Sequence, residues 1–191
     1  LRSLSPYDWE AIARSVSKTA RAVVDSDRPA ILLTDLYQLT MAQSYFQNRK
    51  FDNATFSLFI RSYPPNRGFF VSAGLGDVLD FLTEFSFGPN DIDYLKSMRI
   101  FADDFLDFLK NLRFTGDVWA IPEGRLFFQD EPILEVTAPI IEAQIVETFI
   151  LNQINLQTLI ATKAARVVLA ALVVLPLGAL GLYLALGSPG M

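Results

Sequence analysis

Hydrophobic residues recur with helical spacing in the first fifty positions of the chain. Residues 5–24 carry apolar side chains at roughly helical intervals after a proline, which predicts an N-terminal helical extension within residues 1–30. A second helix is expected over residues 35–47, with Thr34 as its N-cap. Its apolar residues fall on two neighbouring stripes, so we expect it to have two packing partners. One stripe comprises Leu36, Leu39 and Phe46, and the other comprises Tyr37, Met41 and Tyr45.

Short strand and helix patterns follow one another over the next part of the chain. Residues 53–61 alternate apolar and polar side chains, as a strand does, and a proline-rich turn leads to a second short strand at 69–71. We expect these two strands to form one hairpin. Further helices are predicted at 74–85, 90–98 and 102–111, and further strands at 118–121, 126–128 and 133–136.

A long helix is predicted to begin after Pro139 and to run to residue 166. Acidic residues stand near its start and basic residues near its end, which is the order that the helix dipole favours. Its interior is apolar apart from four amides, which predicts burial in a core or an oligomer interface with an amide-rich seam. The amides are Asn152, Gln153, Asn155 and Gln157.

The last segment, residues 167–191, contains no charged residue. Residues 167–187 are mostly apolar and long enough, at about 1.5 Å per residue, to cross a hydrocarbon layer of roughly 30 Å. Three interpretations are open: a membrane span, a buried helix that breaks near Pro176, Gly178 and Gly181, or a coding sequence that left its natural frame or was cut short.

Composition excludes several classes of protein. A formal net charge of −5, without a run of basic residues, argues against a nucleic-acid binder. The chain has 0 Cys and 0 His, which removes thiolate and imidazole metal sites together with Ser-His and Cys-His catalysis. No metal site is predicted, and any chemistry must use carboxylates, Arg, Lys, hydroxyl groups and aromatic rings.

Five groups of residues carry a family resemblance. Their order and spacing resemble those of nicotinate phosphoribosyltransferase, and the resemblance covers the N-terminal portion of that family, about residues 31–166 here. The matching segments are residues 33–41 (LTDLYQLTM), 67–71 (RGFFV) with 73–75 (AGL), 113–124 (RFTGDVWAIPEG), 141–144 (IEAQ) and 161–166 (ATKAAR).

The resemblance implies a cytoplasmic enzyme of NAD biosynthesis by salvage. Such an enzyme joins nicotinate to phosphoribosyl diphosphate, giving nicotinate mononucleotide and diphosphate, with coupled ATP hydrolysis and a requirement for Mg²⁺. The implied fold class is α/β. An α+β N-terminal domain over residues 31–138 would lead into an irregular α/β barrel of the type II phosphoribosyltransferase kind, completed by a second subunit of a homodimer. This chain would hold the first domain, the long helix that enters the barrel over residues 139–166, and only part of the barrel.

The resemblance also implies roles for four residues. Tyr37 would stack on the nicotinate ring, reaching into the partner subunit's site, and Asp35 would flank it. Arg61 and Arg166 would bind the phosphate groups of phosphoribosyl diphosphate, because guanidinium groups pair well with phosphate oxygens. The family's transiently phosphorylated histidine has no counterpart in this sequence, so no catalytic residue is assigned.

Each of these residues also has an ordinary structural alternative. Tyr37 would then pack beside Met41 while Asp35 supports the start of a helix, and the two arginines would be exposed, solubilising charges. Glu123, in the Pro-Glu-Gly turn, is expected to be structural rather than a general acid.

Beyond Arg166 the tail matches nothing expected of the family. The chain is therefore expected to be a truncated or frame-changed form of the enzyme that is inactive alone. The first alternative is a non-catalytic derivative that is membrane-tethered through residues 167–187 or binds an intact subunit through residues 31–166. A second alternative is a relative that uses nicotinamide instead of nicotinate.

Overall fold

The structure is a computed structural model that describes residues 30–186. The predicted helix over residues 5–24 therefore lies outside the described residues. The described helices are η1 (Ala30–Leu32), α2 (Leu36–Gln47), α3 (Leu75–Thr83), α4 (Pro89–Ser97), α5 (Asp103–Asn111) and α6 (Ile140–Leu186). The strands are β1 (Asn53–Leu58), β2 (Phe70–Val71), β3 (Asp117–Ala120), β4 (Leu126–Phe127) and β5 (Leu134–Pro139). Each element predicted within residues 30–166 is thus present, and its type is confirmed.

The predicted hairpin between residues 53–61 and 69–71 is wrong. β1 pairs antiparallel with β5 and β3 pairs with the other edge of β5, whereas β2 pairs with β4 in a separate sheet. β5 is as long as β1, so all of β1 finds partners, while β2 has only two residues to offer. Cross-strand polar pairs fix the β1–β5 register: the hydroxyls of Thr55 and Thr137 lie 2.8 Å apart, and Ser57 donates to Glu135 Oε1 at 2.7 Å.

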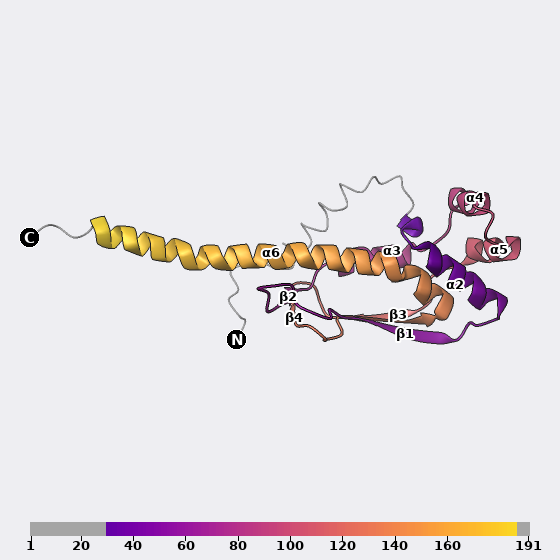
Figure 1. Ribbon diagram of the computed structural model, residues 1–191, viewed down its shortest axis with the longest axis horizontal. Coiled ribbons are helices and arrows are strands. Elements are labelled where there is room, and N and C mark those ends of the chain that lie inside the picture. The colour runs from indigo at the N-terminus through magenta and orange to yellow at the C-terminus, as the bar shows by residue number, and fades with distance from the viewer. Residues whose placement is uncertain (1–29, 187–191) are drawn as a thin grey trace, which may run out of the picture.

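Helix α6 organises the fold through its first half. Helix α3 and strands β1, β2 and β5 pack against it, and α2 packs near its start (Figure 1). One face of this half is buried, and each aliphatic side chain on it contributes roughly 1.5–3 kcal/mol by leaving water. The buried face then continues through Ala161 and Ala165, which pack on Val71 and Ala73 of the second sheet region. Its members in the main core are Ile141, Ala143, Ile145, Val146, Ile150 and Ile154.

The amide-rich seam is only partly confirmed. Gln157 is fully buried, and its Nε2 donates to Asp77 Oδ2 at 2.6 Å and to Gln153 Oε1 at 3.2 Å. Asn152 and Asn155 are exposed instead, because they lie on the face of α6 that no described element covers.

The start of α2 differs from the prediction by one residue. The N-cap is Asp35, not Thr34. The Thr34 hydroxyl lies 2.6 Å from Gln38 Oε1 and 3.2 Å from the carbonyl oxygen of Ile145, so it ties α2 to α6 instead of capping the helix. The prediction of two packing partners for α2 is confirmed, because α2 packs against α6 and α5. In the second apolar stripe, Tyr45 is partly buried against the core, whereas Tyr37 and Met41 are exposed.

The apolar tail continues α6 without a break. The helix runs through Pro176 to Leu186, so the break predicted near Pro176 is absent. The tail projects beyond the rest of the described chain (Figure 1), and its side chains are exposed as far as Leu177, apart from the half-buried Val168. The buried-helix interpretation is therefore wrong for residues 167–177. By length and composition α6 qualifies as a membrane span, but this is weak evidence, because its first half is part of a core.

Two glycines of the family-like segments are required by close packing. Gly116 lies against β5, and a Cβ there would stand 2.5 Å from the carbonyl oxygen of Thr137. Gly74 is the N-cap of α3, with φ of 100°, and a Cβ there would stand 2.9 Å from the carbonyl oxygen of Gln153 in α6. Both glycines therefore allow a backbone to approach a neighbouring element.

The replacement Gly116→Ala tests this packing. It should lower the free energy of unfolding by about 1–3 kcal/mol, because β5 must move to admit the methyl group. Urea unfolding measures the change. Gly68→Ala is the matched control, since a Cβ at Gly68 has no atom within 4 Å. Equal stability of the two variants would contradict the close approach at Gly116.

Removal of the exposed tail should change the solubility of the chain. Exposed apolar side chains on this scale drive association or partition into lipid. We therefore expect the 191-residue chain to aggregate or need detergent, and a chain ending at Arg166 to be much more soluble. Sedimentation of both chains in detergent-free buffer at matched concentration measures this. Equal, monodisperse behaviour would mean that something covers the tail.

Candidate functional site

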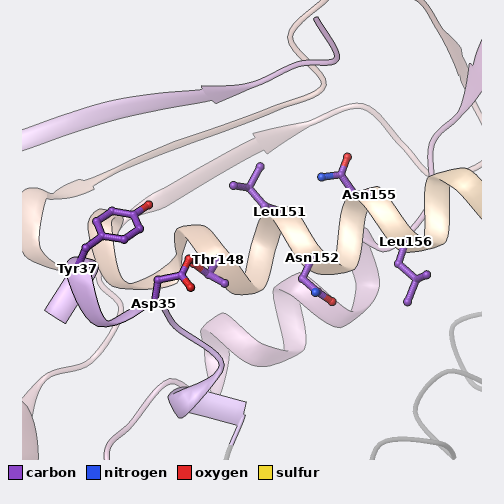
Figure 2. Close-up of a pocket in the computed structure, with 7 residues that line it drawn as sticks. All are labelled: Asp35, Tyr37, Thr148, Leu151, Asn152, Asn155 and Leu156. Carbon is purple, nitrogen blue, oxygen red and sulfur yellow. The ribbon is translucent and has the colours of Figure 1, made fainter. Parts of the chain in front are cut away.

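An open depression lies where the start of α2 meets the exposed face of α6. Its volume is about 380 Å³. Figure 2 shows Tyr37 and Asp35 at one end, with the α6 side chains leading away from them. The lining residues are Asp35, Tyr37, Thr148, Leu151, Asn152, Asn155 and Leu156. Both polar and apolar side chains line it, which suits a small ring with polar substituents.

Tyr37 and Asp35 are brought together at this depression by the first turn of α2. Tyr37 is 50% exposed, so its ring is free to contact a ligand, and the structure does not bury it beside Met41. The Asp35 carboxylate is held from the other side, because the Thr148 hydroxyl lies 2.9 Å from Asp35 Oδ2. Helix α2 therefore supplies both groups, and α6 orients one of them.

A polar network behind Tyr37 was not predicted from the sequence. Its centre is Gln38, which is fully buried and whose Oε1 accepts from the Asp35 backbone N–H at 3.1 Å. Gln38 Nε2 donates to Glu147 Oε2 at 3.0 Å, and Gln144 Nε2 donates to the same oxygen at 3.1 Å. The Tyr37 hydroxyl lies 3.4 Å from it. Gln38 and Gln144 both lie in family-like segments, and this was the sequence signal that could have pointed to the network.

The network also affects the Tyr37 phenol. Desolvation, and then the negative charge of Glu147, raise the pKa of Tyr37 above its ordinary value of 10.0. The hydroxyl therefore keeps its proton at neutral pH and acts as a donor.

The two predicted phosphate-binding arginines lie away from this depression. Arg166 is exposed on α6, about 27 Å beyond Thr148 at 1.5 Å per residue. Arg61 is exposed just past the end of β1, next to Tyr63, whose ring stacks on Phe70 of β2. The adjoining residue of β2, Val71, donates its backbone N–H to Thr162 of α6 at 3.0 Å. Both arginines thus lie toward the β2 end of the molecule.

Two carboxylates of the family-like segments have structural contacts. Glu123 Oε1 accepts from the backbone N–H groups of Gly74 at 2.7 Å and Gly76 at 3.3 Å, so it caps the start of α3. Glu142 is buried, and its Oε2 accepts from the backbone N–H of Thr115 at 2.6 Å. Burial raises the pKa of Glu142 above its ordinary value, although the hydrogen bonds from Thr115 oppose that shift.

Comparison with known proteins decides the family. The N-terminal domain of nicotinate phosphoribosyltransferase matches residues 32–155. The chain belongs to the nicotinate phosphoribosyltransferase family. A nicotinate phosphoribosyltransferase of Mycobacterium tuberculosis is 54% identical over 140 residues, which cover 73% of this chain and 30% of that protein. The Bacillus subtilis enzyme is 43% identical over 137 residues, 71% of this chain and 28% of its own length.

A solved structure supports the same family assignment. The crystal structure of human nicotinic acid phosphoribosyltransferase superposes with a TM-score of 0.66 at 38% identity, covering 72% of this chain and 28% of that chain. The mixed helix and sheet fold is therefore confirmed, and this chain spans under a third of the length of the nicotinate phosphoribosyltransferases it matches. The roles of Tyr37, Asp35, Arg61 and Arg166 stay predictions.

The raised pKa of the buried Glu142 carboxyl predicts that the stability of the folded chain depends on pH. Because its pKa is raised in the folded chain, the folded chain binds this proton more tightly than the unfolded chain. The resulting stabilisation is complete below the ordinary pKa of 4.5 and is lost as pH rises through the folded value. Relative to Glu142→Gln, the unaltered chain should therefore lose free energy of unfolding as pH rises. Urea unfolding at several pH values measures this. A free energy of unfolding that rises with pH in the unaltered chain relative to Glu142→Gln would contradict it.

Proposed function

We propose that this chain supplies the N-terminal domain of an enzyme that transfers a phosphoribosyl group to nicotinate. The products would be nicotinate mononucleotide and diphosphate, formed with ATP hydrolysis, in NAD biosynthesis by salvage. Membership of the family supports the activity. The role of this domain in binding the nicotinate ring is supported by the half-exposed ring of Tyr37 beside the open depression. A flat pyridine ring is well held by such an aromatic face.

The separation of the predicted site residues supports a site shared between two subunits. Arg166 lies about 27 Å farther along α6 than the Thr148 beside Tyr37, too far for one ligand to touch both in a single chain. We propose that Tyr37 and Asp35 of one chain complete the site of a partner in a homodimer. Arg61 and Arg166 then bind phosphate groups in the site of their own chain, as α6 enters the irregular barrel.

Mg²⁺ and ATP are implied by the family. Among residues 30–186, no three or more acidic side chains are arranged to hold a metal ion. We therefore propose that the described residues do not bind Mg²⁺ themselves, and that the metal and ATP depend on parts of the enzyme that this chain does not cover.

The setting of the proposed enzyme is the cytoplasm. The membrane-tethered alternative is not favoured, because its support is one apolar helix whose first half packs in the core. The proposed preference for nicotinate over nicotinamide is supported by membership of the family.

A chimera tests the function and the role of Tyr37. Residues 32–155 would replace the matching segment of the Mycobacterium tuberculosis relative, and formation of nicotinate mononucleotide would be measured with nicotinate, phosphoribosyl diphosphate, Mg²⁺ and ATP. We expect the chimera to be active. In it, Tyr37→Ala should weaken nicotinate binding by roughly 1–2 kcal/mol through lost stacking, about 5- to 30-fold. Tyr37→Phe should have a smaller effect.

The controls separate the role of Tyr37 from a general effect. Tyr94→Ala removes a tyrosine that is similarly exposed, at 56%, but lies on α4 away from the depression, and should change nothing. The 191-residue chain alone should give no product and sets the baseline. An inactive chimera that is correctly folded would contradict the function, and equal activity of the Tyr37→Ala and Tyr94→Ala variants would contradict the site.

A further inference from the structure

Glu147 is held in place directly behind the Tyr37 hydroxyl. Its Oε2 accepts from Gln38 at 3.0 Å and from Gln144 at 3.1 Å, and Gln38 and Gln144 are both buried. The Tyr37 hydroxyl lies 3.4 Å from the same oxygen. Long hydrogen bonds in an unliganded site often shorten when the ligand binds. Two buried amides therefore fix a carboxylate at the polar end of an exposed phenol.

The charge of Glu147 is not neutralised within the described part of the chain. No lysine or arginine among the described residues forms an ion pair with Glu147, and the other charged group that acts on the Tyr37 phenol is also an acid, Asp35. The surroundings of the phenol ring are therefore negative. The two neutral amides fix the position of the Glu147 carboxylate without cancelling its charge.

The proposed reaction changes the charge of the ring that stacks on Tyr37. The lone pair of the pyridine nitrogen forms a bond to the anomeric carbon of the sugar, while the bond from that carbon to the diphosphate oxygen breaks and its electron pair leaves with diphosphate. The nitrogen then has four bonds, and the ring becomes a positively charged pyridinium. Aromatic faces attract cations, and a nearby negative charge strengthens this attraction.

We propose that Glu147 is a positioning residue that makes the Tyr37 ring favour the positively charged pyridinium over the neutral pyridine. It acts through Tyr37, by fixing the phenol and by placing a negative charge behind it. The effect grows as the bond to the sugar forms, so it stabilises the transition state and product more than the substrate. This inference rests on the proposed function. It adds a further residue of α6 to a site lined by α2 and α6.

Two ligands that differ in ring charge test the proposal. Nicotinate has a neutral ring, and N-methylnicotinate has the same ring and carboxylate with a positively charged nitrogen. Their dissociation constants would be measured on the chimera that carries residues 32–155 of this chain, from the shifts of ¹³C-labelled tyrosine rings, with the Tyr37 signals assigned through Tyr37→Ala. We expect N-methylnicotinate to bind about two- to fivefold more tightly.

Charge-neutral variants identify the source of the preference. Glu147→Gln keeps an oxygen that can accept from the amides and from Tyr37 but removes the charge, and should bring the two dissociation constants together. Glu135→Gln is the matched control, because Glu135 lies in β5 and accepts from Ser57 on the sheet, and should leave the preference intact.

Three results would overturn the proposal. The first is equal affinity of the chimera for the two ligands, and the second is a preference that survives Glu147→Gln. The third is that neither ligand shifts the Tyr37 signals. Each is independent of the product assay on the chimera. A failure of the proposed function would appear in that assay as absent product, whereas a failure here leaves that assay unchanged.

Discussion

The packing of the first half of α6 is the constraint on which the rest of the described structure depends. Helices α2 and α3 and strands β1, β2 and β5 all pack on it. The family-like segments meet there as well. Gly74 lets the chain approach the backbone of Gln153, and Glu142 binds the backbone N–H of Thr115. These segments are far apart in the sequence, and packing on α6 brings them together.

The candidate site follows from the same packing. Gln38 is buried between α2 and α6, and its amide joins Asp35 to Glu147. Gln38, Leu39 and Ala42 form the buried face of α2, and Tyr37 lies outside that face, at the open depression. The exposure of Tyr37 is therefore a consequence of how α2 docks, and it gives an aromatic ring to any ligand or partner on that side.

The uncovered face of α6 has a different physical character. Leu151 and Leu156 are exposed beside the depression, and the apolar surface continues into the projecting tail beyond Val167 (Figure 1). One helix thus presents a buried face to its own domain and an apolar face to its surroundings. A surface of this kind favours association with another subunit, which agrees with the proposed sharing of a site between two chains.

The sequence alone determined the element types within residues 30–166 and the family, because both depend on local periodicity and on the order of short segments. Tertiary structure decided the strand partners, since nothing local shows that β1 pairs with β5 across most of the domain. It also decided which amides of α6 are buried. Thr34 contacts α6 in the folded chain, and Asp35 is the N-cap of α2. Glu147 shows the difference most clearly. In the sequence it is one more acid near the start of a helix, and only the docking of Gln38 and Tyr37 against α6 makes it part of a site, because hydrogen bonds between distant segments depend on packing that no local pattern specifies.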